Sequence, residues 1–435
     1  MFRSIGERFN LNPSQKLKTT SRRRTKPAKN RVTESRGRTL HLKFDVILFL
    51  SVIILMVFGM IMVYSSSYDF SQSEWGDSGH IFKRQLLVVG LGIIAMVILA
   101  FFDYHKFKDF ALPGLIIIII SLFAVLIIGD ERHGAARSLF NGSVQPSEFA
   151  KLAIVLYLSV WLYAKREILN NITFGLIPLA VILGVMSAFV LLQPDISAVF
   201  TIMFLGVVMF IVAGGDLRQI GIVLILAIIA AWLTLQLFPT GAQRMEEFLL
   251  GLRNPSEASY HVRRSFEAFV NGGWLGVGIG NSVTKVTGLP VPHTDSVYAV
   301  VGEETGMVGA VGLLVLFLLI LWRGLTIARR APDEMGALLA AGLSIWLAFE
   351  AFINMAGIVN VVPFAGNALP FISAGGSSLF VSMVAVGILL NISRLSIVKD
   401  DEKGSLFSAV IDLRRRDGRG SVPRARRSTG AEVKR

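Results

Sequence analysis

Long apolar runs, joined by short polar segments, make up most of this 435-residue chain. Most runs reach the roughly 17–25 residues with which an α-helix crosses a bilayer. Backbone groups in lipid must be hydrogen-bonded internally, and the runs lack the alternation of a membrane β-barrel, so helices are the expected form. We expect spans at residues 45–64, 85–102, 111–129, 148–164, 174–193, 196–214, 219–238, 299–322, 335–356 and 376–393. The pattern therefore predicts an all-α polytopic membrane protein with ten transmembrane helices.

Composition and charge support a membrane domain between two basic tails. The chain is 53% hydrophobic, 17% charged and free of cysteine, which excludes disulfides and thiolate metal sites. Residues 1–44 carry a net charge of +11 and residues 394–435 carry +6, so residues 45–393 carry −4. Basic segments beside spans stay on the cytoplasmic side, near anionic lipid. We expect both tails to be cytoplasmic, the first to be disordered, and neither to bind nucleic acid.

The preference of Lys and Arg for the cytoplasmic side also orients the loops. The expected inner loops carry Lys106, Lys108, Lys165, Arg166, Arg218, Arg323, Arg329 and Arg330. The outer face then receives residues 65–84, 130–147, 194–195, 239–298 and 357–375. The 239–298 segment, between the seventh and eighth spans, is much the longest. A loop of that length with so many apolar residues is expected to be functional.

Two polar motifs stand at the outer ends of expected spans. Ser147 suits an N-cap, and Glu148 can pair with Lys151 on one helix face. Lys151 would lie one turn inside the membrane, where it is either functional or half of a structural ion pair. Asp195 follows a proline between two spans, and it either caps the next helix or lies at the mouth of a cavity.

The large outer loop carries arginines and a glycine repeat. Arg244, Arg263 and Arg264 could bind a pyrophosphate, or they could be ordinary surface residues. Glycines at 276, 278 and 280 lack the strand–turn–helix unit of a dinucleotide site. We expect them instead to let the backbone approach another backbone or a ligand closely.

The loop ends in a stiff Pro-containing approach to Asp295 at the head of the eighth span. Such an aspartate is either a helix cap or a catalytic acid. Glu303 and Glu304 follow, one to two turns into that span, and they must face protein, water or a cation.

The motifs have a characteristic order: Gln145-Pro146-Ser147-Glu148 with Lys151, Gln193-Pro194-Asp195, Asn271-Gly272-Gly273, His293-Thr294-Asp295, Gly302-Glu303-Glu304-Thr305-Gly306, and Leu369-Pro370-Phe371 through Gly375-Gly376-Ser377-Ser378. Together they resemble the SEDS family, the polytopic FtsW/RodA/SpoVE-type proteins of cell division, elongation and sporulation. The resemblance covers about residues 42–393. The long basic N-terminal tail is more similar to the division branch.

This resemblance implies a peptidoglycan glycosyltransferase at the bacterial cytoplasmic membrane, with the division septum as its expected location. Such enzymes polymerise lipid II into glycan strands on the outer face and release undecaprenyl pyrophosphate. They work with a class B penicillin-binding protein, the transpeptidase, and other divisome proteins. The catalytic acid of the family falls on Asp295, which would act as general base. Arginines, and as a candidate cofactor a divalent cation (Mg²⁺ or Mn²⁺), would stabilise the departing pyrophosphate.

We expect further substrate contacts at the motif residues His293, Thr294, Ser377 and Ser378, and at Arg137 in the 130–147 loop. The sequence also departs from the family pattern in that loop, where Ser138 follows Arg137 in place of a tryptophan. The other departures are Ser197-Ala198, His261, Arg264 and Ala374.

Two other functions remain open. A lipid II flippase would use Lys151, Glu303 and Glu304 as a polar path, although no clear internal symmetry supports a transporter. A non-catalytic scaffold would only recruit the transpeptidase.

Overall fold

The computed structural model describes residues 44–132, 135–138, 144–216, 218–223, 225 and 239–417, with only the backbone course for 130–132, 135–138, 239–240 and 398–417. The predicted N-terminal tail and most of the predicted span at 219–238 lie outside these ranges.

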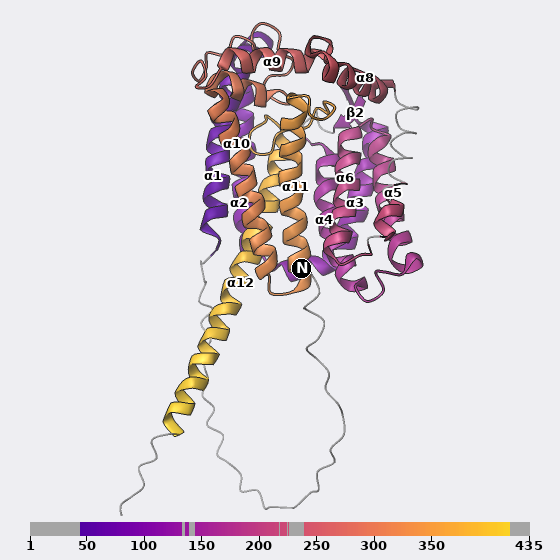
Figure 1. The fold of residues 1–435 in the computed structure, drawn as a ribbon, viewed down its shortest axis with the longest axis vertical. Coiled ribbons are helices and arrows are strands. Elements are labelled where there is room, and N and C mark those ends of the chain that lie inside the picture. Colours follow the sequence, from indigo (N-terminus) through magenta and orange to yellow (C-terminus); the bar gives the residue numbers. More distant parts are fainter. Residues whose placement is uncertain are drawn as a thin grey trace, which may run out of the picture. The chain divides into compact units, whose positions relative to one another are not determined.

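The described residues form a bundle of long helices, and the expected all-α membrane fold is confirmed (Figure 1). Eight helical segments are long and apolar enough to cross a membrane, and α6 is a shorter apolar helix. These nine correspond to nine of the ten predicted spans. They are α1 (Val46–Trp75), α2 (His80–Phe101), α3 (Phe107–Ile128), α4 (Pro146–Lys165), α5 (Ile177–Leu191), α6 (Ile196–Val212), α10 (Val297–Arg330), α11 (Glu334–Ile358) and α12 (Gly376–Asp417). A 3-10 turn (Tyr104–Lys106) precedes α3 and a π-helical turn (Ile172–Leu176) precedes α5.

The first helix is longer than predicted. The apolar run ends near residue 64, yet α1 continues to Trp75 and is closed by Gly76 in the left-handed conformation. Three serines of the extension, Ser65, Ser66 and Ser67, are buried against the protein. The expected outer loop 65–84 is therefore mostly helix, because packing against protein can extend a helix beyond its apolar stretch.

The large outer loop also contains helices. It forms α8 (Pro239–Arg253), a 3-10 turn (Pro255–Glu257) and α9 (Tyr260–Gly272), which lie across one end of the bundle (Figure 1). A second small addition is the hairpin β1 (Asp130–Arg132) and β2 (Ala135–Ser138), whose strands pair antiparallel. The sequence pattern predicted neither.

The helices α11 and α12 form the centre of the bundle. In the most apolar 18-residue stretch of each of these two helices, 72% of the residues are buried. In α2 and α3 the share is 22%, so their outer faces are left for lipid. Asp45 ties the ends of three helices together: its carboxylate caps α1, it pairs with Arg323 on α10, and its N–H donates to Ser393 on α12 at 3.0 Å. The site described next is built against these helices.

The glycine repeat packs directly on a kink in α10. At Gly306 the helix is broken by a backbone with φ +67°. The chain around Gly276 hydrogen-bonds to this break, with Val277 N donating to Glu303 O at 3.0 Å and Met307 N to Gly273 O at 2.9 Å. A Cβ on Gly276 would lie 2.3 Å from Glu304 O. The expected close approach of backbone to backbone is confirmed.

Candidate active site

A cavity of about 1340 Å³ opens among α1, α2, α4, α6, the segment before α10 and the start of α12. Its lining draws on all five predicted outer segments, together with the adjoining starts of α4, α6 and α12. Seven of the twelve candidate site residues line it: Lys151, Asp195, His293, Thr294, Asp295, Ser377 and Ser378. The cavity is therefore the candidate active site, since most predicted polar residues converge there.

Asp295 is held through the backbone of its own segment. Three consecutive carbonyls accept hydrogen bonds: His293 O from Ala374 N at 2.8 Å, Thr294 O from Ser373 Oγ at 2.6 Å, and Asp295 O from Asn354 Nδ2 at 3.0 Å. The donors come from α11 and from the irregular segment before α12. Such fixed backbone contacts pre-organise a carboxylate for chemistry.

The same irregular segment also approaches the carboxylate. Asn354 Nδ2 donates a second bond to Asn367 O at 2.5 Å, which ties residues 366–367 to the Asp295 segment. A Cβ on Gly366, where φ is +70°, would lie 3.1 Å from Asp295 Oδ2. The N-cap position of α10 is Ser296, one residue after Asp295. Asp295 thus lies in the turn before the helix, on the cavity wall.

Lys151 forms an ion pair within its helix, as predicted, and another between helices. Its Nζ lies 2.8 Å from Glu148 Oε1 and also contacts Glu350 from α11. Both Glu148 and Lys151 line the cavity, although Lys151 is buried. One cation held by two carboxylates gives this wall a polar surface inside the membrane domain.

Asp195 combines the two roles considered for it. It caps α6, accepting from Ala198 N at 3.2 Å, and it lines the cavity. Ser147 Oγ donates to its second oxygen at 2.9 Å. The predicted N-cap role of Ser147 is wrong: the N-cap of α4 is Gln145, because Pro146 takes the first turn, where its missing N–H costs nothing.

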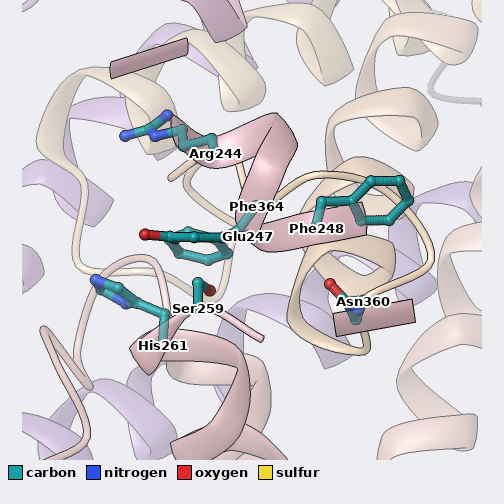
Figure 2. A pocket seen from close by; sticks show the side chains of 7 residues that line it. All are labelled: Arg244, Glu247, Phe248, Ser259, His261, Asn360 and Phe364. Carbon is teal, nitrogen blue, oxygen red and sulfur yellow. The ribbon is translucent and has the colours of Figure 1, made fainter. Parts of the chain in front are cut away.

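Arg244 lies at a different, smaller cavity of about 100 Å³ between α8, the start of α9 and the segment after α11 (Figure 2). The lining includes Arg244 from α8 and His261 from α9, and the His261 ring stacks on Phe364 at 4.6 Å. Burial, followed by the charge of Arg244, lowers the pKa of His261 below its usual value. Arg244 also donates to Ala365 O at 3.3 Å, next to Gly366.

Neither Arg263 nor Arg264 lines the large cavity. Arg263 lies over the Tyr260 ring. Arg264 pairs with Glu267 and donates to Thr287 O at 2.8 Å. The side chain of Arg137, on β2, lies outside the described residues.

The two adjacent acids of α10 contact residues 282–285, which follow the glycine repeat. Glu303 is fully buried and accepts from the Ser282 and Thr284 hydroxyls and from Val283 N at 3.2 Å. It does not line the large cavity. Glu304 is paired with Lys285, whose Nζ lies 2.9 Å from its Oε1, so this acid faces a cation, one of the surroundings expected for it.

Two cavity-lining cations were missed from the sequence, Arg84 and Lys285. Lys285 carried a signal: it is the one lysine or arginine between Glu267 and Glu303. Arg84 stands at the outer end of α2, where a lone arginine is indistinguishable from an interfacial anchor.

His293 is buried on the wall of the cavity. Burial lowers its pKa from 6.5 to about 4, so the ring is neutral at pH 7. Within the described ranges, no cluster of three or more His, Asp or Glu side chains could hold a metal ion.

Residues 45–397 match the FtsW/RodA/SpoVE family, described as cell cycle proteins. The chain is 34% identical over 355 residues to a probable peptidoglycan glycosyltransferase FtsW of Geobacter metallireducens, covering 81% of this chain and 95% of the relative. It is 34% identical over 361 residues to stage V sporulation protein E of Bacillus subtilis, covering 81% and 97%.

Two solved structures are similar over nearly their whole length. One, a chain of a peptidoglycan synthase complex studied for the coordination of polymerization and crosslinking, has a TM-score of 0.67 and 26% identity, covering 82% of this chain and 99% of that one. The other, the rod shape determining protein RodA of Thermus thermophilus, has a TM-score of 0.61 and 25% identity, covering 81% and 97%. With its motifs, fold and relatives in agreement, the chain belongs to the FtsW/RodA/SpoVE family of cell cycle proteins.

Proposed function

We propose that this multi-pass membrane protein is a peptidoglycan glycosyltransferase that polymerises lipid II on the outer face of the cytoplasmic membrane during cell division. The observation that carries the proposal is the large cavity with Asp295 on its wall, its segment fixed by three backbone hydrogen bonds. The relatives named as probable FtsW glycosyltransferases support it.

Asp295 acts as the general base. It removes the proton of the acceptor sugar hydroxyl as that oxygen forms a bond to the anomeric carbon of the donor sugar. The bond from that carbon to the lipid pyrophosphate breaks, and undecaprenyl pyrophosphate leaves. A positioned base typically contributes about 10²–10⁴-fold to the rate.

The leaving pyrophosphate needs positive charge near the membrane surface. Arg84, Lys151 and Lys285 line the cavity and are the candidates that the geometry supports best. Ser377 and Ser378, at the start of α12, add hydroxyl and backbone donors at a helix N-terminus, which favours anions. We propose these residues, with Asp195, His293 and Thr294, as the substrate contacts.

A divalent cation fits the described residues poorly as a resident group, since they offer no cluster of three metal-ligating side chains. Mg²⁺ is often held by one or two carboxylates and substrate phosphates. No step of the mechanism above depends on such an ion.

We propose a class B penicillin-binding protein as the partner, within the divisome. The similarity to a chain of a peptidoglycan synthase complex supports a synthase assembly. The septal location and the cytoplasmic termini belong to the same proposal.

The test is glycan synthesis from labelled lipid II by the purified complex with its transpeptidase. Asp295→Asn, which cannot take a proton, should lose about 10²–10⁴-fold in rate while keeping its thermal stability and partner binding. Asp295→Glu should recover only part, because its carboxylate is displaced by about an ångström. Asp216→Asn, an exposed aspartate in the loop after α6, is the matched control and should polymerise normally.

Full polymer from Asp295→Asn would remove this residue from the mechanism. If the wild-type complex makes no polymer but moves lipid II across vesicles, the protein is a flippase. If it does neither and still recruits the transpeptidase, it is a scaffold.

A further inference from the structure

Four aromatic rings form a continuous cluster on the cavity wall. Phe70 and Trp75 come from the end of α1, His80 from the start of α2, and His293 from the turn before α10, and all four line the cavity. The Phe70 and His293 rings lie 4.8 Å apart, the Trp75 and His80 rings stack at 4.7 Å, and Phe70 meets Trp75 edge-on at 5.8 Å.

The cluster is partly open to the solvent. Trp75 is 50% exposed and Phe70 is 40% exposed, whereas His293, two residues before Asp295, is buried. Apolar ring surface facing water on a cavity wall is unfavourable, and a ligand that covers it gains roughly 25 cal/mol for each Å² removed from water.

The height of the cluster restricts what it can bind. The 30 residues of α1 span about 45 Å, against about 30 Å of hydrocarbon. If α1 leaves the hydrocarbon at the buried Ser65, Trp75 lies ten residues, or about 15 Å, farther along the helix axis. A lipid-linked pyrophosphate stays at the headgroups, so the cluster is at the level of the sugars attached to it.

The carboxylates around the cluster also favour a sugar as its ligand. Asp69 and Glu74 flank the rings of α1 and line the cavity. These carboxylates repel a pyrophosphate but accept hydrogen bonds from sugar hydroxyls.

We propose that Phe70, Trp75, His80 and His293 form a stacking platform for a pyranose ring of the glycan. This inference rests on the proposed glycosyltransferase function and adds a sugar-binding subsite to it. The face of a pyranose carries C–H groups with partial positive charge, which suit the negative face of an aromatic ring. The platform would hold sugar rings above the membrane while Asp295, two residues from His293, acts on the acceptor hydroxyl.

The test compares Trp75→Ala and Trp75→Phe with Trp322→Ala, a control tryptophan on α10 that is 58% exposed. With lipid II and the purified complex, Trp75→Ala should raise KM about tenfold or shorten the glycan strands, with kcat changed much less. This follows if stacking stabilises the bound sugar by about 1.4 kcal/mol, the equivalent of tenfold. Trp75→Phe should stay within about threefold of wild type, and Trp322→Ala should be unchanged.

A second measurement does not depend on catalysis. A soluble β-1,4-linked tetramer of N-acetylglucosamine is titrated into the Asp295→Asn complex, which should bind it as wild type does. The Asp295→Asn/Trp75→Ala complex should bind it at least tenfold more weakly. Equal binding and an unchanged KM in Trp75→Ala would overturn the platform even if polymerisation is normal. Absence of polymer from wild-type complex would instead overturn the proposed function.

Discussion

Asn354 offers a sharp test of how Asp295 is positioned. It is buried on α11, and its amide Nδ2 joins two carbonyls, that of Asp295 at 3.0 Å and that of Asn367 at 2.5 Å. Asn354→Leu keeps the branched shape and the number of side-chain heavy atoms and removes both donors. The two carbonyls then lose their bridge, while the Asp295 side chain is unchanged.

The expected magnitudes follow from this geometry. Each carbonyl that loses its partner in a buried site costs about 1–3 kcal/mol, so the variant should lose about 2–6 kcal/mol of stability. The rate should fall further than stability explains, because a misplacement of about 1 Å in a catalytic group can cost about a hundredfold. We expect polymerisation about 10–100-fold slower in the folded fraction.

The assay is lipid II polymerisation by the purified complex well below its thermal midpoint, with KM and kcat measured separately. Ser344→Ala is the matched control, since this buried serine of α11 donates only to the carbonyl of Ala340 within its own helix. It should lose a little stability and no activity. If Asn354→Leu lowers the thermal midpoint but polymerises at the wild-type rate, the bridge is structural and does not position Asp295.

Three further predictions concern other parts of the molecule. Lys285→Met should destabilise the protein by about 3–5 kcal/mol by leaving a buried carboxylate unpaired, and Glu304→Gln in the same chain should restore part of the loss; calorimetry showing additive losses would contradict the pair. Because burial lowers the pKa of His293 from 6.5 to about 4, the unfolded chain binds a proton that the native chain does not between these values, so the free energy of unfolding should fall by up to about 3 kcal/mol as the pH decreases through this window. His293→Phe should flatten that slope of thermal midpoint against pH, and an unchanged slope would assign it to other groups. A reporter fused after Asp216 should be cytoplasmic and one within 239–298 external; the reverse result at either site would refute the orientation.

The helices of the bundle could be predicted because hydrocarbon imposes both apolar composition and length. Apolar composition and length do not predict the parts of the chain that lie outside the hydrocarbon. The continuation of α1 beyond Ser65 depends on protein contacts that no hydropathy pattern records. Helix α9 carries an apolar face, but a helix so short within a long connection between spans is readily taken for loop.

The candidate site could be predicted where its chemistry is local in sequence. Glu148 and Lys151 are one turn apart, so their pairing follows from helix geometry. Glu350 completes that cluster from another helix, and only the packing of α11 against α4 brings it there. The aromatic cluster has the same character, because Phe70 and His293 are more than 200 positions apart.

The walls of the cavity come from opposite ends of the membrane domain. Trp75 and Ser66 belong to the first helix, and Ser377 and Ser378 to the last, about 300 residues later. At about 5–20 residues per second, a ribosome needs roughly 15–60 s to make the intervening chain. For that time the growing polypeptide holds α1 in the membrane without the donors that fix the Asp295 segment. The cavity is therefore complete only after α12 has inserted. A chain cut short before residue 373 would span the membrane many times and still lack a complete active-site cavity.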